Sequence, residues 1–241
     1  MRFECKMKIL NIDMDNTLIY SYKHDIGREK INVELYNGRE ISYITKRTFE
    51  LLNEIKKRFL IVPTTTRTRE QYERIFLGIG LIKYALVCNG GVLLVDGKVD
   101  EEWYKVSKNL ISNSVDELLK AVLYLESEEL RKFEVRFIEE LFVFTKCDKP
   151  EKVVCKLRYK LNLSLVDVFN NGIKVYVVPK NLVAAGDSEF DISMVECADE
   201  GIVPKDFRSR FELTNDDGKI CEMPGKKVFA EEMLEKICLE R

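Results

Sequence analysis

The stretch Lys8–Tyr20, with the sequence KILNIDMDNTLIY, constrains the fold more than any other part of the chain. Its apolar run ends in two carboxylates, Asp13 and Asp15, which one residue separates. Because side chains alternate along an extended chain, both carboxylates lie on the same side, just past the carboxyl end of a predicted strand. Open α/β sheets bind their ligands at that edge. Two close carboxylates repel each other unless one is protonated or a cation lies between them, and their hard oxygen atoms suit Mg²⁺. A solvated turn is the alternative interpretation of this stretch alone.

The composition of the chain excludes several classes of function. The 241 residues are 33% charged and 46% hydrophobic, enough for one large domain or two small ones. The formal net charge of -2 gives no electrostatic argument for binding nucleic acid or an anionic membrane. No apolar stretch approaches the roughly 20 residues that span a bilayer. The single histidine, His24, excludes a histidine cluster, and we expect it to be a solvated loop residue.

Cysteine usage and the first residues indicate the compartment. The seven cysteines are scattered and form no CxxC pair, which favours a reducing cytosol over a disulfide scaffold. The opening MRFECKMK lacks the apolar segment of a signal peptide. We therefore expect a cytoplasmic protein.

The first hundred residues alternate predicted strands and helices, a pattern typical of a mainly parallel sheet with helical crossovers. Thr45 and Thr68 are predicted helix caps, the second with Gln71 as a capping box. The predicted helices run to about Lys57 and to about Leu77, and the predicted strands are Phe59–Pro63, Tyr84–Cys88 and Val92–Val95.

The pair Asn37-Gly38 between two β-prone runs predicts a hairpin formed by Lys30–Tyr36 and Arg39–Ile44. The hairpin directly follows the carboxylate loop. It can hang over the site as a flap or lie at the surface without a role in the site, and the sequence leaves both interpretations open.

The pattern changes after residue 97, where hairpin links imply antiparallel pairing in the order αββαββ. We therefore predict an α/β protein with two domains. Residues 1–97 plus 180–241 form a Rossmann-like core, a three-layer unit with a mainly parallel sheet, and residues 98–179 form an inserted α+β cap domain. The predicted cap elements are the helices Ser114–Leu130 and Pro150–Leu161 and the strands Phe133–Ile138, Leu141–Lys146, Leu163–Phe169 and Ile173–Val178.

The parallel pattern returns with a predicted strand at 182–185, a helix at 192–198, a strand at Gly201–Val203 and a closing helix at Gly225–Leu239. Three predicted strands of the core thus end in polar clusters, and in a doubly wound sheet these ends converge in one crevice. The clusters are Asp13, Asp15 and Thr17; Thr65, Thr66 and Arg67; and Asp187, Ser188 and Asp191.

These clusters resemble the motifs of the haloacid dehalogenase (HAD) superfamily. The DxDxT motif matches residues 13–17, the Thr or Ser after the second strand matches Thr65, and the GDxxxD motif matches Gly186–Asp191. The NGG turn at 89–91 and the inserted domain look most like the subgroup of Cof-type, sucrose-phosphate and trehalose-phosphate phosphatases and phosphomannomutases. Asn16 stands where the family often has Gly, and Asn tolerates the same tight turn.

The resemblance implies a role for each motif residue. Asp13 would be the nucleophile that forms an aspartyl-phosphate, and Asp15 would protonate the leaving alcohol and then deprotonate water. Thr65 would hold a phosphoryl oxygen. The Mg²⁺ ligands would be the Asp13 carboxylate, the backbone carbonyl of Asp15 and Asp187, with Asp191 supporting them directly or through water.

Other site residues follow with less support from the motifs. Thr17, Thr66 and Asn89 are candidate substrate-binding residues. For Thr66 and Arg67 a structural role in the turn is the stronger interpretation. The family places a phosphate-neutralising Lys after the cap, and Lys180 is nearer that position than Lys174, but the usual helix beside it is absent from the pattern.

The connection around Lys180 is unexpectedly short. Two or three residues join the strand that ends near Pro179 to the next core strand, whereas a parallel crossover ordinarily needs a dozen or more. Either the crossover helix has been lost, or the sequence omits a segment between Lys180 and Ala184. We favour the second interpretation, in which the omitted segment would hold the true Lys. Cα–Cα distances near 3.8 Å throughout would contradict it.

Three functions remain open from the sequence. The first is an Mg²⁺-dependent phosphatase of a small phosphorylated metabolite, with a sugar phosphate as one candidate. The second is a phosphomutase with the same nucleophile, and the third is a weakly catalytic regulatory or phosphate-sensing protein. The sequence identifies neither the substrate nor the oligomeric state.

Overall fold

The computed structural model describes residues 8–180, 192, 195–196, 200–211 and 219–239. Its contacts divide the chain into two compact units, one of Met1–Lys98 with Val183–Arg241 and the other of Val99–Leu182. The division lies at 98/99 and 182/183, whereas the sequence analysis placed it at 97/98 and 179/180.

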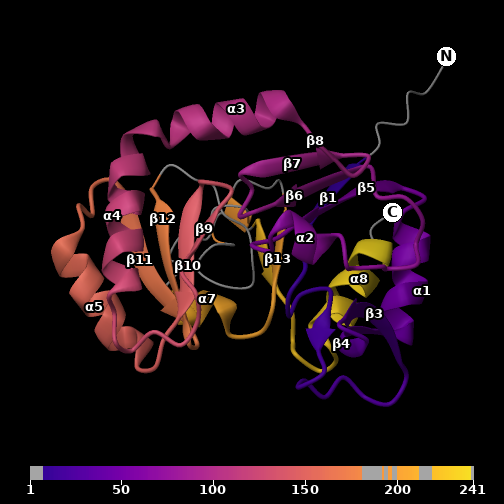
Figure 1. The fold of residues 1–241 in the computed structure, drawn as a ribbon. Helices are drawn as coiled ribbons and strands as arrows, with labels where there is room; N and C mark the ends of the chain where they lie inside the picture. Colours follow the sequence, from indigo (N-terminus) through magenta and orange to yellow (C-terminus); the bar gives the residue numbers. More distant parts are fainter. Residues whose placement is uncertain (1–7, 181–191, 193–194, 197–199, 212–218, 240–241) are drawn as a thin grey trace. The chain divides into compact units, whose positions relative to one another are not determined.

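The first unit contains a five-stranded sheet in the order β1-β5-β6-β7-β8 (Figure 1). Strands β1, β5 and β6 are parallel, and β7 pairs with β6 in the antiparallel direction. In register, Asp13 lies opposite Thr64 and Thr64 lies opposite Leu86, so the carboxyl ends of three strands are aligned. The strands are β1 (Lys8–Asp13), β5 (Phe59–Thr64), β6 (Tyr84–Val87), β7 (Val92–Val95) and β8 (Lys98–Val99).

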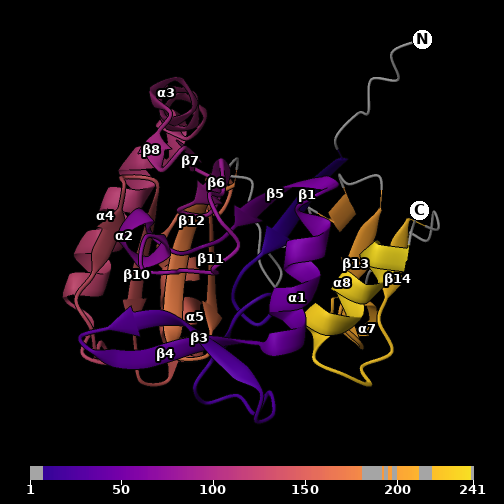
Figure 2. The ribbon, with the colours of Figure 1, turned by 90° about the vertical axis from the view of Figure 1, so that its right-hand side faces the viewer.

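Helices α1 (Lys46–Ile55) and α8 (Phe229–Leu239) pack against each other, as Figure 2 shows. The predicted N-cap of helix α1 is confirmed, because the Thr45 hydroxyl accepts a hydrogen bond from the Thr48 N–H at 3.0 Å. One apolar core joins these helices to β1 and β5, and its most buried members include Ile12, Leu51, Leu52, Ile55, Ile61, Met233, Leu234 and Ile237. The remaining C-terminal elements are the parallel strands β13 (Gly201–Val203) and β14 (Ile220–Glu222) and the short helix α7 (Phe207–Arg210).

The predicted hairpin is confirmed as β3 (Lys30–Tyr36) and β4 (Arg39–Thr45), with β2 (Tyr20–Ser21) beside β4. Asn37 and Gly38 have φ of 51° and 72°, the left-handed backbone that a two-residue hairpin turn requires. The pairing is irregular on both sides of Glu34, which marks a bulge in the ladder.

Helix α2 is shorter than predicted. The capping box of Thr68 and Gln71 is present, but the helix is Arg69–Tyr72 and does not reach Leu77. The backbone of the following residues pairs with the hairpin instead, since the Phe76 N–H donates to the Val33 carbonyl at 2.8 Å. This contact with β3 ends the helix.

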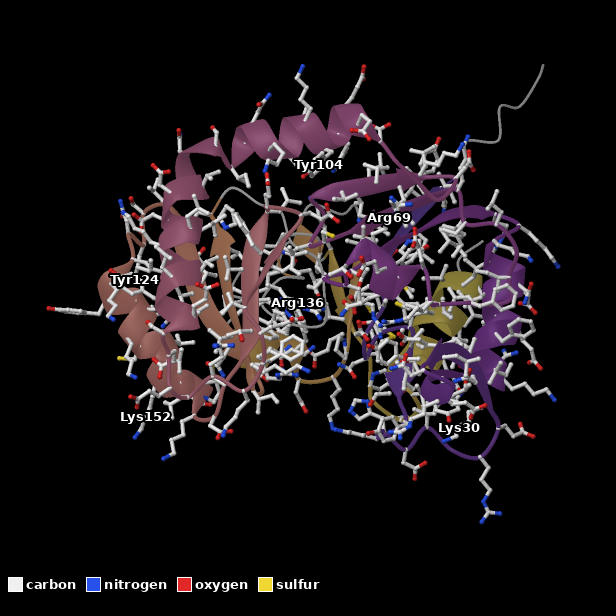
Figure 3. All side chains as sticks on the ribbon, viewed as in Figure 1. Lys30, Arg69, Tyr104, Tyr124, Arg136 and Lys152 are labelled. Carbon is white, nitrogen blue, oxygen red and sulfur yellow. The ribbon has the colours of Figure 1, made fainter. Side chains whose placement is uncertain are left out.

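The second unit contains an antiparallel sheet in the order β11-β12-β10-β9, with helices α4 and α5 packed on it. The predicted αββαββ order is present, but helix α3 (Glu101–Leu110) and the 3₁₀ turn at Ser112–Ser114 precede it and were not predicted. Tyr104 of helix α3 is labelled in Figure 3, and its hydroxyl donates to the carbonyl of Glu139, in the turn between β9 and β10, at 3.0 Å. The other elements are α4 (Val115–Glu126), β9 (Arg136–Ile138), β10 (Phe142–Lys146), α5 (Pro150–Lys160), β11 (Val166–Asn171) and β12 (Lys174–Pro179).

Several predicted features fall outside the described residues. They are the strand at 182–185, the GDxxxD motif at 186–191, most of the helix at 192–198, and the connection from residue 181 to Ala184. Among the residues that are described, no helix is both long enough and apolar enough to cross a membrane.

Candidate active site

The loop after β1 carries the two carboxylates in different environments. Asp13 ends the strand and is only 5% exposed, whereas the side chain of Asp15 is 44% exposed. Met14, between them, is fully buried, and its carbonyl accepts hydrogen bonds from the N–H groups of Leu18 (2.9 Å) and Ile19 (2.8 Å). The loop therefore closes on itself, with Met14 in the core.

Asn16 adopts the left-handed backbone that the tight turn requires, with φ of 62°. Asn is one of the few residues other than Gly that enters this region at low cost. Thr17, one residue further, is buried, and its carbonyl accepts a hydrogen bond from the Tyr20 hydroxyl at 3.1 Å.

The end of β5 lies beside the end of β1. Thr65 follows Thr64 directly and is fully buried, and its hydroxyl accepts a hydrogen bond from the Arg67 N–H at 3.2 Å. The Thr65 N–H donates to the Leu86 carbonyl of β6 at 2.9 Å, which keeps this end in the sheet. Thr66 is partly exposed. The structure thus places Asp13 and Thr65 at neighbouring strand ends.

The end of β6 adds Asn89. Its backbone N–H donates to the Thr65 carbonyl at 3.1 Å, and its φ is 63°. The side chain is 2% exposed, and within the described part of the chain nothing donates a hydrogen bond to its Oδ1 atom. An acceptor that is buried in this way is costly unless something supplies a donor.

An ion-pair network with Glu34 buried at its centre joins this site to the hairpin. The guanidinium of Arg67 binds both carboxylate oxygens of Asp15, through Nε at 2.7 Å and Nη2 at 2.8 Å. Its Nη1 donates to Glu34 Oε1 at 2.8 Å, and Arg74 donates to the same oxygen at 3.2 Å. The second oxygen of Glu34 accepts the Ser42 hydroxyl at 2.6 Å. The side chain of Glu34 has no exposed surface and that of Arg67 is 14% exposed.

Arg67 stays charged within this network. Burial alone would lower the pKa of the Arg67 guanidinium, but the hydrogen bonds and charges of Asp15 and Glu34 outweigh burial and raise this pKa above its ordinary value. Arg67 is therefore a permanent cation within hydrogen-bond distance of the exposed carboxylate.

Comparison with known proteins starts from the fold, because no family model and no curated sequence matches this chain. The sucrose-phosphatase from Synechocystis sp. PCC6803, solved with sucrose and phosphate, is similar at a TM-score of 0.57 and 16% identity, over 80% of this chain and 89% of that one. A haloacid dehalogenase-like hydrolase from Bacteroides thetaiotaomicron is similar at a TM-score of 0.53 and 17% identity, over 96% and 100% of the two chains. Another such hydrolase, from B. subtilis, gives 0.54 and 13%, over 95% and 99%.

The chain has the haloacid dehalogenase-like (HAD) fold. The predicted fold class, with its mainly parallel core sheet, is therefore confirmed.

Within this HAD fold, three predicted site residues lie outside the described part of the first unit. Lys180 lies at the end of β12 in the second unit, where its Nζ is 3.6 Å from Asp167 Oδ1 and its N–H donates to the Leu165 carbonyl at 3.1 Å. Its role next to a phosphate stays a prediction. Asp187 and Asp191 lie outside the described residues.

The metal site can be tested only by the chemistry of its donors. In the described part of the chain, no three His, Cys, Asp or Glu side chains gather as metal ligands, and two of the four predicted ligands fall outside that part. The donors that are described, the buried Asp13 carboxylate and the main chain of Asp15, are oxygen atoms of the kind that Mg²⁺ prefers. These donors are two of the four predicted Mg²⁺ ligands.

Sequence reasoning missed Arg67 and Glu34 at this site. Arg67 was assigned to the turn, and Glu34 was given no role. The sequence contains no signal for Glu34, because polar and apolar residues alternate from Lys30 to Leu35 and this pattern places Glu34 on the polar face of the ladder. No sequence pattern identifies its partner.

Proposed function

We propose that this chain is an Mg²⁺-dependent phosphatase that hydrolyses a small phosphorylated metabolite through an aspartyl-phosphate. One observation carries the proposal: Asp13 is buried at the carboxyl end of β1, directly beside the end of β5 where Thr65 lies. Its support is the DxDNT turn with left-handed Asn16, in a fold shared with HAD hydrolases.

The reaction has two halves. In the first, a carboxylate oxygen of Asp13 attacks phosphorus, the bond from phosphorus to the alcohol oxygen breaks, and Asp15 gives that oxygen its proton. In the second, Asp15 takes a proton from water, the water oxygen attacks phosphorus, and the bond to Asp13 breaks to release phosphate.

Other residues of the chain bind and orient the phosphoryl group. The Thr65 hydroxyl accepts the Arg67 N–H, which leaves its own hydrogen to donate to a phosphoryl oxygen. Asn89, at the end of β6, stays a candidate substrate-binding residue. When bound, Mg²⁺ would offset the repulsion between the carboxylates and the phosphate.

The test is phosphate release with a panel of phosphorylated metabolites and Mg²⁺. We expect Asp13→Asn to abolish turnover, because an amide does not attack phosphorus as a carboxylate does. Asp15→Asn should slow turnover by roughly 100-fold or more, the scale of general acid–base catalysis. EDTA should stop the reaction and added Mg²⁺ should restore it.

Two outcomes would decide against this proposal. Full activity of the Asp13→Asn protein would exclude the aspartyl-phosphate. Substrate consumption without an equal amount of free inorganic phosphate would favour a phosphomutase.

A further inference from the structure

We propose that Arg67 is a positioning residue for Asp15, and that Glu34 of the hairpin fixes Arg67 in that role. The inference rests on the proposed function, since it assigns the control of the acid–base carboxylate. It favours a role of the hairpin in the site over a surface hairpin without such a role.

The hairpin ladder is built to aim Glu34 inward. Asn32 pairs with Tyr43, Glu34 with Ser42 and Leu35 with Glu40, so the register shifts on both sides of Glu34. Bulges of this kind redirect side chains and are common next to active sites. As a result Val33 and Glu34, two consecutive residues, are both buried, which strict alternation would not produce.

Burying the Glu34 carboxylate costs free energy that holding the hairpin in place does not require. Apolar side chains of similar volume often replace buried ion pairs without loss of stability, so the pair is weak evidence for a stabilising role. Glu34 is nevertheless fully satisfied, by Ser42, Arg74 and Arg67. What this arrangement achieves that apolar packing would not is a fixed direction for the Arg67 guanidinium.

That direction matters because, among the described residues, Arg67 alone restrains the Asp15 carboxylate. Its side chain is 44% exposed, and the described contacts of its carboxylate are the two bonds from Arg67. A guanidinium that binds both oxygens fixes the plane of the carboxylate as well as its place. To hold the proton that it delivers and later collects from water, Asp15 must release one of its two bonds to Arg67 while the other keeps the carboxyl group in place, so misplacement affects both halves of the reaction.

The decisive experiment compares leaving groups. Arg67→Lys keeps the positive charge but loses the planar guanidinium that binds both oxygens of Asp15. Glu34→Gln keeps the side-chain volume but loses the negative charge. We expect kcat/KM to fall about tenfold or more for an alkyl phosphate, within the effect expected of a general acid. For p-nitrophenyl phosphate, whose leaving group needs no proton, the fall in kcat/KM should be several-fold smaller. An equal fall for both substrates would show a merely structural role and overturn the proposal.

The hairpin also provides a matched control. Glu40 lies on the neighbouring strand, is exposed, and accepts a hydrogen bond from the Tyr43 hydroxyl at 2.9 Å. Glu40→Gln should leave kcat/KM unchanged for both substrates. If Glu40→Gln gave the same leaving-group effect as Glu34→Gln, the proposal would be wrong.

A readout without catalysis separates this inference from the proposed function. Urea midpoints of wild type, Asp15→Asn, Arg67→Lys and the double variant form a cycle, and we expect the double variant to lose less than the sum of the two single losses. Additive losses would mean that no Arg67–Asp15 pair exists in solution, whatever the activity. If the stability losses are coupled but the wild-type protein has no phosphatase activity, the proposed function is wrong. The catalytic role of the Arg67–Asp15 pair is then wrong with it. Because Arg67 is partly exposed, Arg67→Lys keeps the test available if Glu34→Gln does not fold.

Discussion

The ionisation of the Tyr72 hydroxyl should make the stability of the folded protein depend on pH at high pH. Burial raises its pKa from 10.0 to about 12. The folded state therefore keeps a proton that the unfolded state loses, and this contribution to stability is complete below pH 10 and lost as the pH rises from 10 to 12. A shift of one pKa unit corresponds to about 1.4 kcal/mol, so the loss is about 2 to 3 kcal/mol.

We expect Tyr72→Phe to lose about that much less stability than wild type between pH 9 and pH 12. Urea unfolding at several pH values measures the difference. Tyr159 is 94% exposed, so Tyr159→Phe serves as the control and should follow wild type. Parallel stability curves for wild type and Tyr72→Phe would contradict the assignment.

The site residues that the sequence predicted are those that a short motif contains. Asp13, Asp15 and Asn16 are neighbours in the chain, and the turn that orients them is set by local backbone preferences. Arg67 and Glu34 belong to a different kind of site residue. The ion pairs of Arg67 reach 52 positions to Asp15 and 33 positions to Glu34, and no local periodicity predicts them.

At the level of elements, the N-terminal end of α8 depends on one side chain. Glu232 is nearly buried and accepts hydrogen bonds from three successive backbone N–H groups, those of Gly225 (2.9 Å), Lys226 (2.6 Å) and Lys227 (3.0 Å). These three donors precede the helix, and no other hydrogen bond is made by them within the described part of the chain.

We expect Glu232→Gln to lower the free energy of unfolding by about 1 to 3 kcal/mol, because the amide has one acceptor oxygen in place of two. Chemical denaturation measures the loss. Glu235→Gln is the matched control, since Glu235 makes partly exposed ion pairs with Arg47 and Lys227 and should cost at most about 1 kcal/mol. Equal losses of stability in the two variants would argue against a stabilising role for the hydrogen bonds to Glu232.

The elements themselves show where prediction succeeds. Hairpin β3–β4 and helix α1 carry their own start and turn signals, and both were predicted. Helix α2 carries a correct start signal but stops after Tyr72, because pairing of Phe76 with Val33 overrides helical propensity. Helix α3 had a usable signal, Asp100 as N-cap before two acidic residues, and reading it would have found the helix.

At the scale of the whole molecule, the two units differ in continuity. Val99–Leu182 is a single stretch with its own sheet, while the other unit is assembled from both ends of the chain. We expect residues 99–182, expressed alone, to unfold cooperatively on heating, since a domain with its own core can fold by itself. Circular dichroism at 222 nm measures this, and a broad, non-sigmoidal transition would contradict it. A role for this unit as a cap stays a prediction.

The short connection after Lys180 stays a prediction too, because the residues that test it lie outside the described part.

The contact between α1 and α8 bears on the order in which a growing chain acquires its structure. The Thr45 hydroxyl binds Glu231 at 2.6 Å across 186 positions, and closing so long a loop carries an entropic cost that local elements avoid. Synthesis from the N-terminus therefore makes Asp13 and its neighbours first, but the core behind them is incomplete until α8 has emerged from the ribosome. The contiguous stretch 99–182 emerges before α8 and can fold while the N-terminal segment is still incompletely packed. In translation, Asp13 would be among the first residues made and among the last to reach its final position.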